Sequence, residues 1–106
     1  MLAAAAALFF LGADAATADV FSEAAKIGAN ADAMKYCRDK VASRDDRGNY
    51  NLLAIQSAKE YDDLDSDDRL KALVYRKAAE GGDYLGDPLT EERCDSIRKL
   101  LFIKYQ

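Results

Sequence analysis

The sequence contains no histidine, only one proline and only two cysteines, and its apolar runs are short. Without histidine, the Ser–His and Cys–His nucleophile pairs and the usual zinc sites cannot form. The chain also contains no Cys-x-x-Cys, no Walker loop, no dinucleotide-binding fingerprint and no Gly-x-Ser-x-Gly in a suitable context. These absences predict a protein that is not an enzyme and that binds no cofactor.

The longest apolar run, residues 2–11, carries no charge and is too short to cross a bilayer, which takes ~20 apolar residues in a helix. It has the length of the apolar region of a secretory signal peptide, and small residues follow it in the Ala-x-Ala pattern. We expect cleavage after Ala18, although no lysine or arginine precedes the run. An Ala-rich helix packed on the domain and an uncleaved anchor are the alternatives. The prediction is a signal peptide at 1–18, a single domain at 19–106, and no membrane span after cleavage.

The two cysteines, Cys37 and Cys94, each lie on the apolar side of a segment with helical periodicity. In an exported chain such a pair favours a structural disulfide. The bridge would join the first helix of the mature protein to the last. A periplasmic or secreted location follows from this interpretation, and two unpaired buried thiols are the alternative.

The net charge is −4, and removal of the leader would make it −3 because Asp14 is the only charged side chain in the leader. Binding to nucleic acid requires a concentrated basic face. The acidic balance therefore argues against a nucleic-acid partner.

Apolar residues recur at steps of three and four in four segments, as in amphipathic helices. The first segment is 20–41, and its poor helix formers Gly28 and Asn30 are expected either to bend it or to split it in two. A polar loop at 43–51 separates it from the second segment, 50–64. The third starts at an N-cap, Asp65 or Ser66, presents Leu70, Leu73, Val74 and Ala78 on one face, and ends at Gly81 and Gly82.

The fourth segment begins either at Pro88 with Asp87 as cap or at a Thr90 cap. Its apolar face consists of Cys94, Ile97, Leu101 and Tyr105, widened by Leu100. With Phe102 and Ile103 the last two turns are apolar nearly all round, so we expect them to be deeply packed or part of an interface, such as that of a homodimer. The fold class predicted is all-α, a small bundle of four helices (three to five), orthogonal or up-down, held by one disulfide.

Three acidic residues, Asp63, Asp65 and Asp67, match positions 1, 3 and 5 of an EF-hand calcium loop. The match fails afterwards, because Asp68 replaces the glycine at position 6 and Val74 replaces the glutamate at position 12. An acidic loop leading into a helix N-terminus is the simpler interpretation, so no metal site is predicted, and weak calcium binding is kept as an alternative.

Partner contact is predicted at the Gly-rich loop 82–88, through Asp83, Tyr84, Leu85 and Asp87. The six tyrosines are expected in the core, at its rim, or at an interface. The hypothesis is an exported helical protein with a non-enzymatic, protein-binding role.

In outline, the cysteine placement and the C-terminal helix at 94–105 resemble two kinds of small bacterial periplasmic proteins. One is the acid-stress chaperones, which dissociate to expose hydrophobic surface; the other is the immunity proteins that block cell-wall amidase toxins of type VI secretion. The resemblance implies two alternatives, an acid-stress chaperone and an immunity protein or inhibitor. No motif identifies the chain as a member of either family.

Overall fold

The computed structural model describes residues 21–106, and the predicted leader with its cleavage site lies outside them. Over this range the chain is mostly helical, which confirms the all-α class, with one small hairpin that the sequence did not reveal. The helices are α2, α3, α4 and α5, and the hairpin consists of strands β1 and β2. Their bounds are Glu23–Lys40 for α2, Arg47–Asp62 for α3, Ser66–Glu80 for α4, Asp83–Tyr84 for β1, Asp87–Pro88 for β2 and Glu91–Lys104 for α5.

Three of the helices begin at a side-chain cap, as their sequences indicate. Ser22 Oγ accepts from the Ala25 amide at 3.1 Å, and Asp65 Oδ1 accepts from the Asp68 amide at 2.9 Å. Thr90 Oγ1 caps α5 in the same way, accepting from the Arg93 amide at 3.2 Å. Each cap satisfies an amide that has no partner within its helix. Of the alternatives left open by the sequence, Asp65 and Thr90 are the caps.

Three sequence expectations are corrected by the structure. Helix α2 runs without a break through Gly28 and Asn30, because Asn30 is held by a hydrogen bond from Tyr84 and so does not compete for its own backbone. Helix α3 starts at Arg47, inside the predicted loop, after a short turn closed by a hydrogen bond from the Asp46 amide to the Ser43 carbonyl. Pro88 does not open a helix but pairs with Asp83 in the hairpin.

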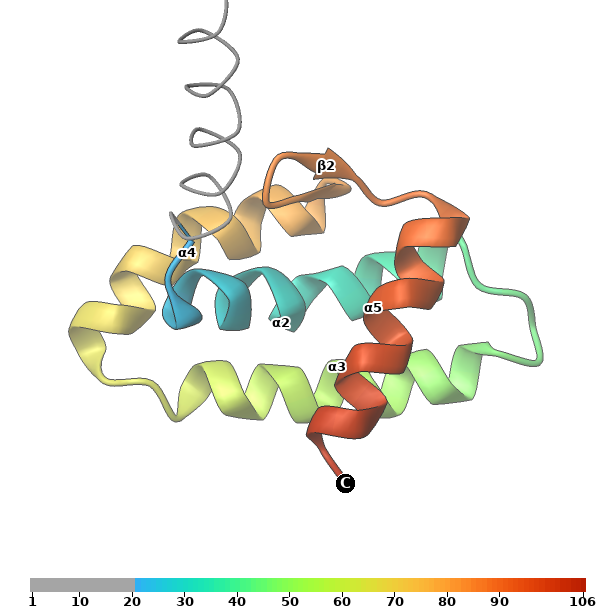
Figure 1. Ribbon diagram of the computed structural model, residues 1–106, viewed down its shortest axis with the longest axis horizontal. Helices are drawn as coiled ribbons and strands as arrows, with labels where there is room; N and C mark the ends of the chain where they lie inside the picture. The colour runs from blue at the N-terminus through green and yellow to red at the C-terminus, as the bar shows by residue number, and fades with distance from the viewer. Residues whose placement is uncertain (1–20) are drawn as a thin grey trace, which may run out of the picture.

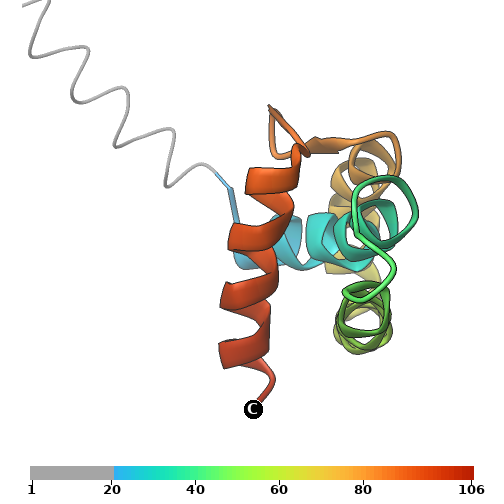
Figure 2. The ribbon, with the colours of Figure 1, turned by 90° about the vertical axis from the view of Figure 1, so that its right-hand side faces the viewer.

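Helices α2, α3 and α4 lie side by side in one layer, with α2 in the middle (Figure 1). Helix α5 packs across one face of this layer at a steep angle, as the view turned by 90° shows (Figure 2). The central position of α2 explains its composition, since eleven of its eighteen residues are buried and most of those are small. The arrangement is an antiparallel, up-down layer of three helices with a fourth helix crossing it.

The contact between α2 and α4 is made by small side chains, and this reverses the expected orientation of α4. A Cβ atom built on Gly28 would lie 2.4 Å from the carbonyl oxygen of Ala72, so the two backbones touch. Ala72 and Ala79 are the buried residues of α4, whereas Leu70 and Val74 are 73% and 65% exposed. The large apolar face that the periodicity identifies on this helix therefore lies outward.

The core lies where α5 crosses α2 and α3. Met34 and both cysteines are fully buried there, and Ile97 and Leu101 reach them from α5. A smaller cluster around Tyr61 and Ile27 packs against Ala72 at the other end of the layer. All six tyrosines are buried or half-buried, as expected of core and rim residues. Within residues 21–106, no helix combines the length and the apolar character needed to span a membrane.

Candidate functional site

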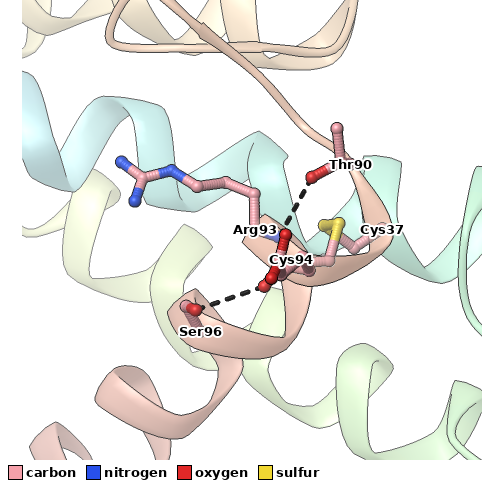
Figure 3. The surroundings of a disulfide bond; sticks show 6 residues. Cys37, Thr90, Arg93, Cys94 and Ser96 are labelled. Carbon is pink, nitrogen blue, oxygen red and sulfur yellow. Dashed lines mark hydrogen bonds between the residues drawn. A yellow bond between two sulfur atoms is a disulfide. The ribbon is translucent and has the colours of Figure 1, made fainter.

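The disulfide between Cys37 and Cys94 forms as predicted and joins α2 to the first turns of α5. The two Cα atoms are 5.8 Å apart, and both side chains are completely buried. The Thr90 cap lies next to the bridge, so the start of α5 is fixed by both its cap and its covalent link (Figure 3). Because solvent does not reach either sulfur atom, the bridge is a structural element and not a reactive site.

Of the four hairpin residues predicted to contact a partner, two are half-buried and two are exposed to solvent. The Tyr84 hydroxyl donates to Asn30 Oδ1 at 2.6 Å, and the Arg93 guanidinium lies 5.4 Å from the centre of the Tyr84 ring. Burial raises the pKa of Tyr84 above its ordinary value. Leu85 is half-buried against the core. Binding of a partner at this hairpin stays a prediction. The contacts of Tyr84 and Leu85 show that both side chains also pack within the protein itself.

Asp83 and Asp87 are the exposed residues of that predicted set. Asp87 lies 3.5 Å from the Arg93 guanidinium, and Asp83 pairs through its backbone with Pro88. The hairpin therefore offers two solvated carboxylates and little apolar surface, which is a poor match to the apolar centre of a typical protein interface.

The carboxylates of the partial EF-hand match each have a local structural role or position. Asp65 caps α4, Asp63 forms an exposed ion pair with Lys59, and Asp67 lies in the first turn of α4, where the helix dipole favours an acid. Within residues 21–106 no group of three or more acidic or cysteine side chains is placed to hold a metal ion.

A groove lies between α3 and the end of α5. We name it the α3–α5 groove; its volume is about 350 Å³ and its lining residues are Asn49, Leu52, Leu53, Gln56, Arg98, Phe102, Tyr105 and Gln106. Leu53 is buried, while Leu52 and Phe102 are 56% and 60% exposed. Two large apolar side chains from different helices thus border a hollow whose remaining lining is mainly polar.

Other exposed apolar residues lie on α3 and at the end of α5. Ile55 lies one turn after Leu52 on α3, and Leu100 and Ile103 flank Phe102 on α5, all of them at least 60% exposed. In the stretch 100–103 only Leu101 is buried. The sequence predicted that the end of α5 would be either deeply packed or part of an interface, and the exposure of three of these four residues excludes deep packing within the monomer.

The position of the end of α5 is fixed by polar contacts with α3. The Tyr105 hydroxyl donates to Glu60 Oε1 at 2.7 Å, and Lys104 Nζ lies 2.9 Å from Glu60 Oε2. Burial, followed by the hydrogen bond to Glu60, raises the pKa of Tyr105 well above its ordinary value. Tyr105 therefore stays protonated at neutral pH and keeps donating its hydrogen bond.

A second hollow, between α5 and the turn before α3, is lined by carboxylates. Its volume is about 490 Å³, and its lining residues are Val41, Ala42, Ser43, Asp46, Tyr50, Glu91, Glu92 and Asp95. Burial raises the pKa of Tyr50, and hydrogen bonds from Arg98 and then Lys99 lower the pKa of Asp95. The four acids keep this hollow hydrated and negative, unlike the α3–α5 groove.

The α3–α5 groove presents apolar, amide, guanidinium and phenol side chains. Its titratable groups are Arg98, which carries a fixed positive charge, and Tyr105, which is neutral. The comparisons supply no relative from which a role could be transferred: no family model matches the chain, and neither the curated proteins nor the solved structures contain a significant match. The groove is therefore judged on its own geometry.

Proposed function

We propose that this chain is an exported, non-enzymatic protein that binds a segment of another protein in the α3–α5 groove. One observation carries the proposal: Leu52 and Phe102 border a hollow and remain more than half exposed. Grooves with apolar walls and a few polar groups are the usual sites at which proteins take up a ligand or a partner helix.

Exposed apolar surface of this extent is unfavourable in water. Each buried Å² of apolar surface contributes ~25 cal/mol, so covering Leu52, Phe102 and their neighbours would be favourable. Single exposed apolar residues are normal on a protein surface, whereas exposed apolar side chains from two helices that border the same hollow indicate an interaction site. The exposed stripe of Leu70, Leu73 and Val74 lies on one helix, α4. Of these three residues only Leu73 borders a hollow, and that hollow is lined mostly by charged residues.

The groove is also held in one shape before any partner arrives. The disulfide fixes the start of α5, and the bonds from Tyr105 and Lys104 to Glu60 fix its end against α3. A preorganised site loses little conformational entropy on binding, which favours affinity.

Export is supported by the apolar run at 2–11 and by the buried disulfide, which persists in an oxidising compartment. The test is the mass of the protein isolated from the periplasm or medium of producing cells. A mass equal to that of residues 19–106 with two hydrogens fewer is expected. A full-length, reduced chain recovered only from the cytosol would contradict export.

Binding at the groove is tested by placing a photo-crosslinking amino acid, p-benzoylphenylalanine, at Phe102 and separately at Leu70. The residue at 102 should yield a discrete heavier product after irradiation of producing cells, and the one at 70 should not. Leu70 is a matched control because it is an exposed apolar residue on α4. Equal products from both positions, or none from position 102, would contradict the proposal; a product that contains only this chain would instead identify a homodimer.

An acid-stress chaperone and an immunity protein both bind another protein, so both would use such a surface. The lowered pKa values of Asp39 and Asp95, caused first by hydrogen bonds from Arg38 and Arg98, are relevant to the chaperone. Their contribution to stability is present above the ordinary carboxylate pKa of about 4 and is lost as the pH falls through the folded-state values. Dye binding to apolar surface between neutral pH and about pH 3 tests this alternative, and an unchanged signal contradicts it.

A further inference from the structure

We infer that the segment bound in the α3–α5 groove is acidic as well as apolar, with a large apolar side chain between Leu52 and Phe102 and a carboxylate on Arg98. This inference rests on the proposed function and specifies the chemistry of the partner.

The first step concerns the charge of the groove. None of its eight lining residues is acidic, and one of them, Arg98, is a permanent cation. The segment of α5 that borders the groove, residues 96–106, contains Arg98, Lys99 and Lys104 and no acid. The net charge of the whole chain is −4, so this end of α5 has the opposite sign to the molecule as a whole.

The second step concerns how these cations are already used. Asp95 accepts from one terminal nitrogen of Arg98 and also pairs with Lys99 at 3.1 Å, while Glu60 pairs with Lys104. Two carboxylates thus face three cations around the end of α5. Arg98 has five N–H donors in a planar fork, and the bond to Asp95 Oδ1 is made by its Nη2. Tyr50 also lies beside this guanidinium. The donors that Asp95 and Tyr50 leave free can bind a carboxylate in the groove, the acceptor to which arginine is best matched.

The third step concerns the alternatives. A second copy of this chain, paired through α5, would bring together two segments, residues 96–106 of each copy, that both carry positive charge. A basic partner would be repelled by Arg98. Neither objection applies to a segment that is acidic and apolar.

The test is selection from a displayed library of random peptides on the mature, oxidised protein, followed by measurement of Kd for enriched peptides by fluorescence anisotropy. Enriched peptides should combine Leu, Ile or Phe with Asp or Glu. Phe102→Ser and Arg98→Gln should each raise Kd about tenfold or more, equivalent to at least 1.4 kcal/mol. Leu70→Ser and Lys77→Gln, which change exposed residues of α4, should leave Kd unchanged.

A charge reversal distinguishes electrostatic recognition from a general loss of structure. Arg98→Glu should weaken binding of the acidic peptides and, in a fresh selection, enrich peptides with lysine or arginine in place of the acids. Circular dichroism spectra confirm that each variant is folded. Peptides without acids, or peptides whose Kd does not respond to Arg98 and Phe102, would overturn this inference. The proposed function would still stand if the crosslink at position 102, and not the one at position 70, captured another protein.

Discussion

Gly28 on α2 faces the backbone of Ala72 on α4 so closely that a Cβ atom there would lie 2.4 Å from the Ala72 carbonyl oxygen. The glycine therefore sets the distance between these two helices. We expect Gly28→Ala to lower the free energy of unfolding by about 2 kcal/mol, because overpacking a buried contact costs more than the ~1 kcal/mol that alanine gains in a helix. Urea denaturation followed by circular dichroism measures the change.

Gly48 is the matched control for this prediction. It lies in the first turn of α3, and nothing comes within 4 Å of a Cβ atom built there. Gly48→Ala should raise stability by about 0.5–1 kcal/mol, since it restricts only the unfolded chain and the helix gains a better former. If both variants shifted the free energy of unfolding in the same direction, the close contact between Gly28 and Ala72 would not explain the effect of Gly28→Ala.

Reduction of the disulfide should destabilise the protein strongly. The cysteines are separated by 57 positions in the sequence, and closing a loop of this size contributes about 4 kcal/mol in the chain-entropy model. For a domain of this size, that loss corresponds to a fall in Tm of roughly 15–30 °C. Helix content at low temperature should persist, because the apolar contacts of Ile97 and Leu101 remain.

Thermal melting with and without a reductant provides the measurement. A Cys37→Ala/Cys94→Ala variant should melt at a low temperature in both conditions, because it has no bridge to lose. A reductant effect of similar size on this variant would mean that the bridge is not the cause.

Arg76 should be required for the stability of the α2–α4 contact. Its Nε lies 3.1 Å from Asp32 Oδ1, the Asp32 side chain is only 6% exposed, and the guanidinium also covers the Tyr61 ring at 4.5 Å. Arg76→Gln leaves a buried carboxylate without its cation, so we expect a loss of about 3 kcal/mol in urea denaturation.

Lys77 supplies the comparison for Arg76. It pairs with Glu80 at 3.9 Å on an exposed surface, so Lys77→Gln should cost less than ~0.5 kcal/mol. Adding Asp32→Asn to Arg76→Gln should recover part of the loss, because it removes the uncompensated charge. A double variant less stable than Arg76→Gln alone would contradict this explanation.

Alkaline pH should loosen the end of α5. The pKa of Tyr105 is raised in the folded state, by burial first and then by Glu60. The stability that this group contributes is therefore complete below the ordinary tyrosine pKa of about 10 and is lost as the pH rises through the folded-state value. Ultraviolet titration of tyrosinate should show a highly alkaline phase that disappears in Tyr105→Phe.

Tyr75→Phe controls for the loss of one tyrosine. The Tyr75 ring packs edge-on against Phe21 at 5.9 Å, away from Glu60, so this variant should keep the most alkaline phase. If that phase survived in Tyr105→Phe, the hydrogen bond to Glu60 would not be its source.

Much of the fold follows from local sequence signals. A capping side chain bonds to an amide within four residues of it in the sequence. The caps Asp65 and Thr90 can therefore be predicted from the sequence, and so can the end of α4 at Gly81. The pairing of Cys37 with Cys94 follows from there being only two cysteines, both on apolar faces. The orientation of α4 does not follow, because it depends on the fit of Ala72 to Gly28, a contact between residues 44 positions apart.

The candidate site was only partly visible in the sequence. The unusual apolar run at 100–103 indicated either a core or an interface, and only the packing of α5 on α3 decides that Phe102 stays outside. Leu52 and Leu53 are adjacent, but Leu52 is exposed and Leu53 is buried. The periodicity assigns only Leu53 to the core and says nothing about the role of Leu52. Conversely, the Gly-rich composition of 82–88 indicated an exposed loop, whereas Tyr84 found a buried partner in Asn30.

The bridge between Cys37 and Cys94 also closes a covalent ring that contains all of α3 and α4. A protease that cuts once inside this ring, for instance in the exposed turn at 43–46, would release no fragment, since both halves stay joined through sulfur. The α3–α5 groove would then still have its two walls in one molecule. In a compartment that contains proteases and few reductants, the same bridge that stabilises the fold would let the protein survive a single cut.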